Sequence, residues 1–259
     1  MDLAYTASGF LVGFIVGMTG VGGGSLMTPL LVLVFGITPA VAVGTDLLYA
    51  AITKSGGSWV HGRRGTVNWK IAGLLALGSL PASITTILLL KYFALDVKRL
   101  SILITTTLGI ALILTAGALI FKEQLREYAR RKLAHRPAWS ERKISVVTVV
   151  AGIVLGILVT ISSVGAGALG TAFLFFLYPR LTAVQIVGTD IVHAVPLTAV
   201  AGLGHVALGS VNWILLGSLL LGSLPGIYIG SHLAAKVPER VLRPMLACML
   251  VLIGGKLIF

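Results

Sequence analysis

Long apolar stretches recur along the chain from Leu3 to Phe259, and they limit the fold more than any other feature. Several exceed the roughly 20 residues that an α-helix needs to cross the hydrocarbon core of a bilayer. The strands of a membrane barrel would instead alternate polar and apolar residues at every second position. Charged residues make up 11% of the 259 residues, whereas soluble domains have roughly a quarter. The sequence therefore predicts an all-α integral membrane protein.

The two halves of the chain repeat each other. Residues 65–81 and 209–225 are identical at 11 of 17 positions, at an offset of 144. The same offset aligns Gly44-Thr45-Asp46 with Gly188-Thr189-Asp190, and one residue of slippage aligns the glycine cluster at 21–24 with 164–167. Shared motifs in the same order indicate a tandem duplication. We therefore expect a first membrane repeat at 1–121, a basic linker at 122–143 and a second membrane repeat at 144–259.

Each repeat is expected to contain two short apolar segments that flank a glycine cluster, followed by three longer transmembrane helices. The predicted segments are 3–19, 25–37, 40–60, 67–90 and 100–121 in the first half, and 144–162, 168–178, 182–204, 211–234 and 241–258 in the second. An odd number of segments per half makes the second half enter the bilayer from the opposite face. Such inverted-topology repeats are typical of secondary transporters, although channels and intramembrane enzymes can be duplicated too.

Basic residues predict the orientation in the inner (cytoplasmic) membrane. Most of the net charge of +12 lies in the connections at 61–70, 122–143, 178–182 and 235–243. Cytoplasmic connections carry an excess of Lys and Arg, so the central basic loop should be cytoplasmic and both termini outside. The charge thus reports orientation and gives no reason to expect a nucleic-acid partner.

A glycine cluster interrupts an apolar run in each half, which predicts a broken helix. Non-helical backbone at membrane depth must be buried in protein or line a watery cavity. A helix that restarts there points unpaired N–H groups and a positive dipole end into that space, which favours an anion. The alternative is close helix packing or a plain turn. Together with the paired threonines, the candidate substrate-binding residues are Gly22, Gly23, Gly24, Ser25, Thr45, Ser162, Ser163, Gly165, Gly167 and Thr189.

Ionisable residues inside apolar segments are further candidates. Asp46 and Asp190 must be paired, neutral or near water, because a charge at the bilayer centre costs about 2.5 to 3.5 kcal/mol on the least severe scales. They could serve in gating or proton relay, or as structural hydrogen-bond partners. Lys54, whose repeat mate is Thr198, could bind the substrate anion, pair with Asp46 or extend towards the cytoplasm. His193 follows Asp190 by one helical turn, which suits a proton relay or a structural pair.

Motifs for catalysis are missing from the sequence. There is no phosphate-loop Lys-Ser/Thr, HExxH, CxxC or GxSxG pattern, and Cys248 is the only cysteine. We therefore expect no catalytic residue, no metal site and no cofactor, and an enzyme is disfavoured.

The motifs in combination resemble those of a known family. They comprise the G-x-x-G-x-G-G-G cluster at 17–24, Pro-Leu-Leu at 29–31 and Ala-Val-Gly-Thr-Asp at 42–46, with weaker copies after the linker. This pattern is similar to the sulfite exporter TauE/SafE family of membrane transporters, also called the toluene sulfonate uptake permease family. The resemblance spans essentially the whole chain.

The resemblance implies secondary transport of a small sulfur-containing anion, sulfite or an organosulfonate, by alternating access, with export as the expected direction. The expected partners are that anion, the lipid bilayer and a coupling ion, either proton or sodium. A homodimer is left open. The alternatives are a carrier of another organic acid anion, an importer, an anion channel or an intramembrane enzyme.

Overall fold

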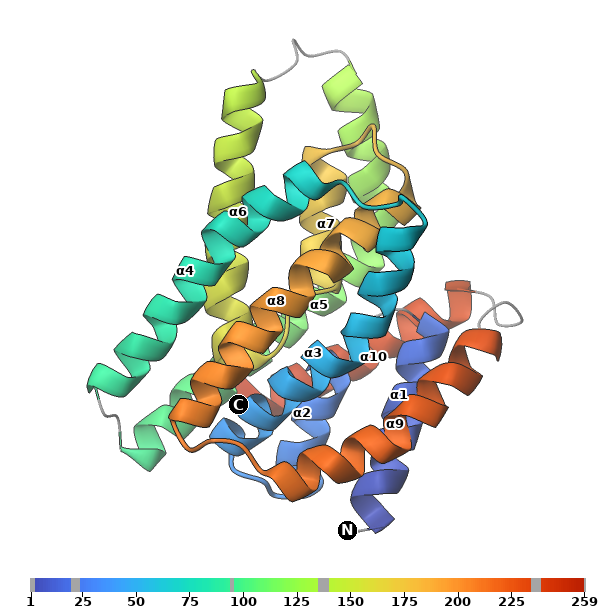
Figure 1. Ribbon diagram of the computed structural model, residues 1–259. Helices are drawn as coiled ribbons and strands as arrows, with labels where there is room; N and C mark the ends of the chain where they lie inside the picture. Colours follow the sequence, from blue (N-terminus) through green and yellow to red (C-terminus); the bar gives the residue numbers. More distant parts are fainter. Residues whose placement is uncertain (1–2, 20–23, 94–95, 135–139, 234–238, 259) are drawn as a thin grey trace.

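The structure is a computed structural model that describes residues 3–19, 24–93, 96–134, 140–233 and 239–258. Within these ranges every regular element is an α-helix (Figure 1). The helices are α1 (Leu3–Thr19), α2 (Gly24–Leu33), α3 (Pro39–Arg63), α4 (Trp69–Phe93), α5 (Val97–Ala134), α6 (Glu141–Ser162), α7 (Ala168–Leu177), α8 (Ala183–Ala207), α9 (Trp213–Leu233) and α10 (Glu239–Ile258). The predicted all-helical membrane architecture is confirmed.

Length and hydropathy together set some of these helices apart. Five of the described helices, α4, α5, α6, α8 and α9, contain a stretch long and apolar enough to cross a membrane. By contrast, α2 and α7 have 10 residues each. At 1.5 Å per residue each is about 15 Å long, which is half of the roughly 30 Å hydrocarbon core. Neither α2 nor α7 can therefore cross the bilayer alone.

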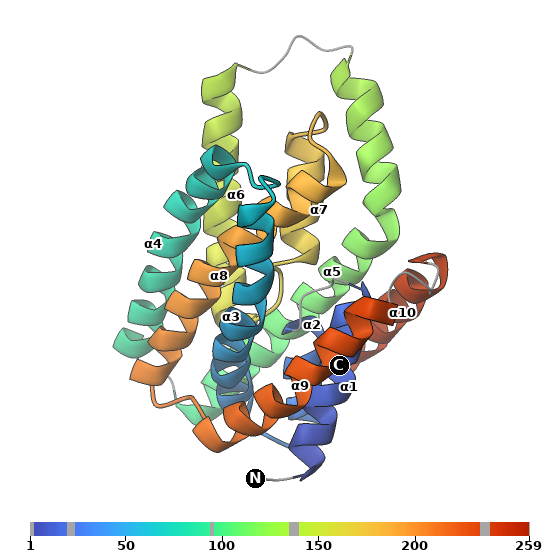
Figure 2. The same ribbon diagram turned by 45° about the vertical axis from the view of Figure 1, so that its right-hand side comes forward.

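The basic segment predicted as a linker at 122–143 is largely helical over its described residues. Helix α5 continues to Ala134, past the predicted segment end at 121, because residues 122–134 are nearly all strong helix formers. Helix α6 begins at Glu141, where the Ser140 hydroxyl accepts a hydrogen bond from the Lys143 amide at 3.3 Å. The joined ends of α5 and α6 extend beyond the other helices (Figures 1 and 2).

The two halves exchange their packing partners. Helix α1 of the first half lies along α9 of the second, and α4 lies along α6 (Figures 1 and 2). Small residues permit this, because they let helix backbones approach closely in a membrane. Several glycines lie on the facing sides of these helices, and a Cβ added to any of them would meet backbone of the opposite helix. They are Gly9, Gly13 and Gly17 of α1, Gly222, Gly226 and Gly230 of α9, Gly78 of α4, and Gly152 and Gly156 of α6.

Helices α3 and α8, which carry the two Gly-Thr-Asp motifs, cross at the centre in opposite directions. Gly44 near the start of α3 contacts His205 and Ser210 at the far end of α8, and Gly188 near the start of α8 contacts His61 and Thr66. Two corresponding helices with opposite directions are consistent with opposite entry of the halves. That inversion stays a prediction.

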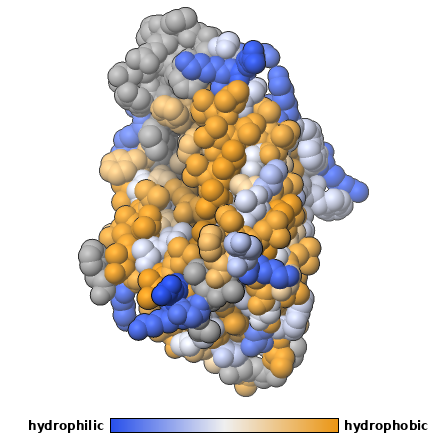
Figure 3. All heavy atoms as spheres, turned by 90° about the vertical axis from the view of Figure 1, so that its left-hand side faces the viewer, coloured by the Kyte–Doolittle hydropathy of each residue, from blue (hydrophilic) through white to orange (hydrophobic). Residues whose placement is uncertain are grey.

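The outer surface is apolar over its middle. On the face seen in Figure 3, hydrophobic side chains cover the central part, and hydrophilic ones gather towards the upper end and in the lower part. Exposed side chains on α4 and α6 include Leu77, Leu88, Val146 and Val150. A surface of this kind suits contact with acyl chains.

Candidate functional site

The helix break in the second half forms one wall of the candidate site. After α6 ends at Ser162, Ser163 adopts a left-handed conformation with φ 59°, and Gly165 and Gly167 have φ 122° and 135°. Only glycine adopts the last two values without strain. The break is therefore built into the sequence, as the glycine pattern predicted.

The start of α2 lies against the break of the second half. The Cα of Gly24, the first residue of α2, lies so close to the Ser163 carbonyl that a Cβ would overlap it. Ser25 is buried beside it. Gly22 and Gly23 lie outside the described residues, so their predicted role remains untested.

Lys54 reaches the break from α3. Its Nζ donates a hydrogen bond to the Ala166 carbonyl at 2.8 Å, which uses one of the three ammonium donors. The Lys54 ammonium interacts electrostatically with both Asp190 and Asp46. Direct ion pairs among the described residues join only other side chains, those of Lys70 and Arg99. Lys54 is partly accessible, as a ligand-binding side chain has to be.

Asp46 is tied to the short helix α2. The Thr28 hydroxyl donates to Asp46 Oδ2 at 2.5 Å, and both residues are fully buried. The Ser163 side chain lies near the same carboxyl group. Neither Asp46 Oδ1 nor Ser163 Oγ has a partner in hydrogen-bonding geometry among the described residues. Asp46 thus links α3, α2 and the second break.

Among the described contacts, Asp190 lacks the hydrogen bond that Asp46 receives from a threonine. Its carboxyl group packs against the Cα of Gly170 in α7, where a Cβ would overlap Oδ1. Within the described residues Oδ1 accepts no hydrogen bond, although Asp190 is 1% exposed. The repeat mate of Thr28 is Thr171, and its hydroxyl donates to the Ala168 carbonyl at 3.1 Å instead. The two aspartates therefore have different surroundings despite their equivalent positions.

His193 faces Ser79 of α4. Its Nε2 lies 2.8 Å from Ser79 Oγ, and both side chains are buried. Ser79 was not among the predicted residues, but it belongs to a Gly-Ser-Leu-Pro motif present in both halves. In the first half the equivalent pair is Tyr49 and Ser223, whose side chains also lie near each other. The repeated motif was therefore the available signal for Ser79.

The remaining predicted hydroxyls bind backbone. Thr45 Oγ1 accepts from the Asn212 amide at 3.1 Å, and Thr189 Oγ1 accepts from the Asn68 amide at 2.9 Å. Each threonine thus holds the start of a helix of the opposite half. Ser162 Oγ donates to the Leu158 carbonyl at 2.7 Å. Substrate contact by these three residues stays a prediction.

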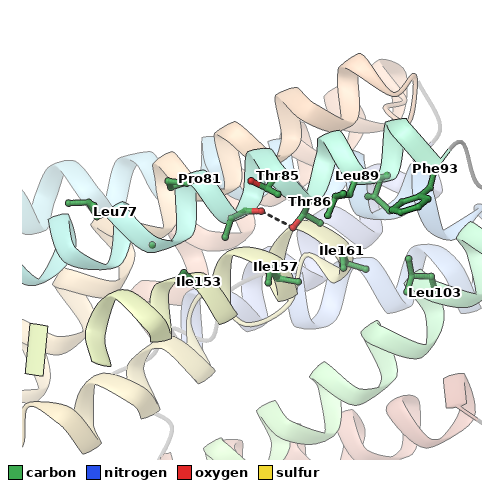
Figure 4. A pocket seen from close by; sticks show the side chains of 13 residues that line it. Leu77, Pro81, Thr85, Thr86, Leu89, Phe93, Leu103, Ile153, Ile157 and Ile161 are labelled. Carbon is green, nitrogen blue, oxygen red and sulfur yellow. Dashed lines mark hydrogen bonds between the residues drawn. The ribbon is translucent and has the colours of Figure 1, made fainter. Parts of the chain in front are cut away.

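A separate groove on the outer surface lacks the chemistry for an anion. It has a volume of about 540 Å³ and lies between α4 and α6, with Leu103 of α5 at one end (Figure 4). Its lining is apolar apart from Thr85 and Thr86, and the Thr86 hydroxyl donates to the Ala82 carbonyl at 2.7 Å. Its position on the apolar surface suits acyl chains.

The described residues contain no group of three or more His, Cys, Asp or Glu side chains that could hold a metal ion. The charged groups at the breaks are those of Lys54, Asp46 and Asp190.

Comparison with known proteins identifies the family of the chain. Residues 5–257 match the family described as Sulfite exporter TauE/SafE. The chain belongs to this family. As a TauE/SafE member it is 40% identical to the "Probable membrane transporter protein YjnA" of Bacillus subtilis (strain 168) over 259 residues, all of both chains. It is 30% identical to "Probable membrane transporter protein YdhB" of the same organism over 216 residues, 80% of each chain. No solved structure matches this TauE/SafE chain.

Proposed function

We propose that this TauE/SafE protein is a secondary carrier of small sulfur-containing anions, sulfite or an organosulfonate, across the cytoplasmic membrane. The observation that carries the proposal is Lys54, an ammonium group inside a membrane helix that reaches the break between α6 and α7. Ionisable residues within membrane segments face interiors or pathways. A cation at a broken helix is the arrangement that recognises an oxyanion.

The bound anion would lie beside Lys54, where the start of α2 meets the break between α6 and α7. The remaining ammonium donors and the Ser163 hydroxyl, which has no partner in hydrogen-bonding geometry among the described residues, would donate to its oxygens. The start of α2 at Gly24 and Ser25 would add the positive end of a helix dipole. We propose that rocking of the exchanged helix pairs, α1 with α9 and α4 with α6, exposes this position alternately to the two sides.

Counterflow in proteoliposomes tests the proposal. Vesicles loaded with unlabelled sulfite, or with one of several sulfonates, should transiently concentrate the radiolabelled anion, and the rate should saturate with concentration. Lys54→Ala should lower the apparent affinity by about 10-fold or more, since a hydrogen bond to a charged group contributes about 1.5 to 3 kcal/mol. Export is the direction we propose, in line with the family's description.

Other outcomes separate the alternatives. Exchange of a carboxylic acid anion alone would point to a different organic acid as the substrate. Unitary currents in planar bilayers without saturation would indicate a channel. Chemical conversion of the anion would indicate an enzyme, and each of these results would contradict the proposal.

A further inference from the structure

Asp46 and Asp190 occupy equivalent positions in the repeat but differ in their hydrogen bonds, which indicates different functions. Asp46 receives a hydrogen bond from Thr28. Asp190 Oδ1 receives none from a described residue, and the Thr171 hydroxyl that could supply one is bound to a carbonyl. An ionised carboxylate buried without donors is costly, and the cost is removed by a nearby cation or by a proton.

The nearby cation is Lys54. Its charge acts on both Asp190 and Asp46, without a direct ion pair among the described contacts, and of the two carboxylates Asp190 is the one without a hydrogen bond from Thr28 or its repeat mate. If an anion binds Lys54, the ammonium charge is shared and the Asp190 carboxylate loses part of its stabilisation. A proton on Asp190 then becomes favourable. By linkage, a proton on Asp190 strengthens anion binding by the same factor.

Other titratable groups around Asp190 are few. Helix α3 contributes Lys54, which also acts on Asp46, and His61, which contacts Gly188, while α8 itself contributes His193. Helix α7 has no charged residue, and those of α4 and α6 lie at their ends: Lys70, Lys91, Glu141, Arg142 and Lys143. His193 is one helical turn from Asp190, binds Ser79 and has an Nδ1 without a described partner. It is placed to pass a proton to the carboxylate.

Sodium fits this place poorly. In transporters with broken helices, Na⁺ is coordinated by carbonyl groups of the unwound segment. Here the unwound Ala166 carbonyl is already bound by the Lys54 ammonium, which occupies the position and carries the charge that Na⁺ would supply.

We infer that Asp190 is the proton-binding residue that couples transport, and that a proton and the anion cross the membrane together in one direction, outward when the anion accumulates in the cytoplasm. The inference rests on the proposed function. In the cycle, a proton from water binds an Asp190 carboxyl oxygen as the anion binds Lys54. Both leave on the other side, and the carboxylate then interacts with Lys54 again. Asp46, held by Thr28, keeps the break assembled and carries no coupling proton.

Methanesulfonate is a suitable probe, because its sulfonate group stays ionised near neutral pH and any proton movement belongs to the protein. Proteoliposomes would contain a trapped pH indicator, and uptake of radiolabelled methanesulfonate would be recorded in parallel. Wild type should acidify the lumen by about one proton per anion, and a sodium gradient should have no effect. Radiolabelled sulfite counterflow on the same vesicles reports the carrier activity itself.

Asp190→Asn should retain counterflow but lose lumen acidification and any stimulation by a pH gradient. Asp46→Asn is the matched control: the amide oxygen can still accept from Thr28, and the ratio of protons to anions should stay that of wild type. Counterflow with no acidification in wild type, stimulation by sodium, or an unchanged proton ratio in Asp190→Asn would each overturn the inference alone. Absence of both counterflow and methanesulfonate uptake in wild type would contradict the proposed function and the inference with it.

Discussion

Replacement of Lys54 by methionine tests the electrostatic arrangement without any substrate. Methionine keeps the length and apolar stem of the side chain but removes the charge and the 2.8 Å hydrogen bond to the Ala166 carbonyl. The change should lower the free energy of unfolding, because Asp190 loses its nearby cation. Loss of a hydrogen bond from a charged donor costs about 1.5 to 3 kcal/mol.

A more specific test is the coupling free energy between Lys54 and Asp190, measured in a double-mutant cycle. Residues in one electrostatic network show coupling energies of about 0.5 to 3 kcal/mol. Because these two interact without a direct ion pair, we expect about 1 to 2 kcal/mol, in the middle of that range. The double variant Lys54→Met with Asp190→Asn should thus be more stable than the sum of the single changes implies.

Reversible unfolding in mixed detergent micelles, followed by circular dichroism, gives the four free energies of the cycle. The cycle with Asp46→Asn is the matched comparison and should give a smaller coupling, since Asp46 already accepts a hydrogen bond from Thr28 and depends less on the cation. If Lys54 and Asp190 are additive within about 0.5 kcal/mol, the two side chains do not interact and the reasoning about the site fails.

The other predictions concern packing, the site and orientation. Gly226→Leu should destabilise the protein by about 1 to 3 kcal/mol or more, since its Cβ would overlap α1 backbone, while Gly73→Leu, which faces open space, should not shift the melting temperature. Gly170→Ala should displace the Asp190 carboxyl group and abolish the lumen acidification that accompanies methanesulfonate uptake, whereas Gly73→Ala should leave the acidification at the wild-type level. A cysteine at position 140, introduced as Ser140→Cys in a Cys248→Ala background, should react with an impermeant maleimide only from the cytoplasmic side.

Sequence patterns predicted the elements well for a physical reason. In a bilayer, a helix is the way for a single apolar segment to satisfy its backbone, so apolar runs and glycine clusters translate almost directly into helices and breaks. The extension of α5 to Ala134 was missed because the predicted end was set where the apolar run stops. Helix propensity continues past that point.

The hydrogen-bond partners of the side chains could not be predicted from the sequence. The offset of 144 identifies equivalent residues, but it does not say which helices of opposite halves lie together. Contacts such as Thr45 with Asn212 and Ser79 with His193 follow from the exchange of helices between halves. The difference between Thr28 and Thr171 is not visible in the repeat either, because both are threonines at matching positions.

The exchanged packing also bears on how the protein is made. When α1 leaves the ribosome, the helix that covers its glycine face, α9, has yet to be synthesised, and α9 starts only at Trp213. Until α9 has been synthesised, Gly9, Gly13 and Gly17 of the N-terminal half must therefore face lipid or an insertion factor. Assembly is completed late and across the whole chain, so two separately expressed halves should each be degraded alone and protect one another when produced together.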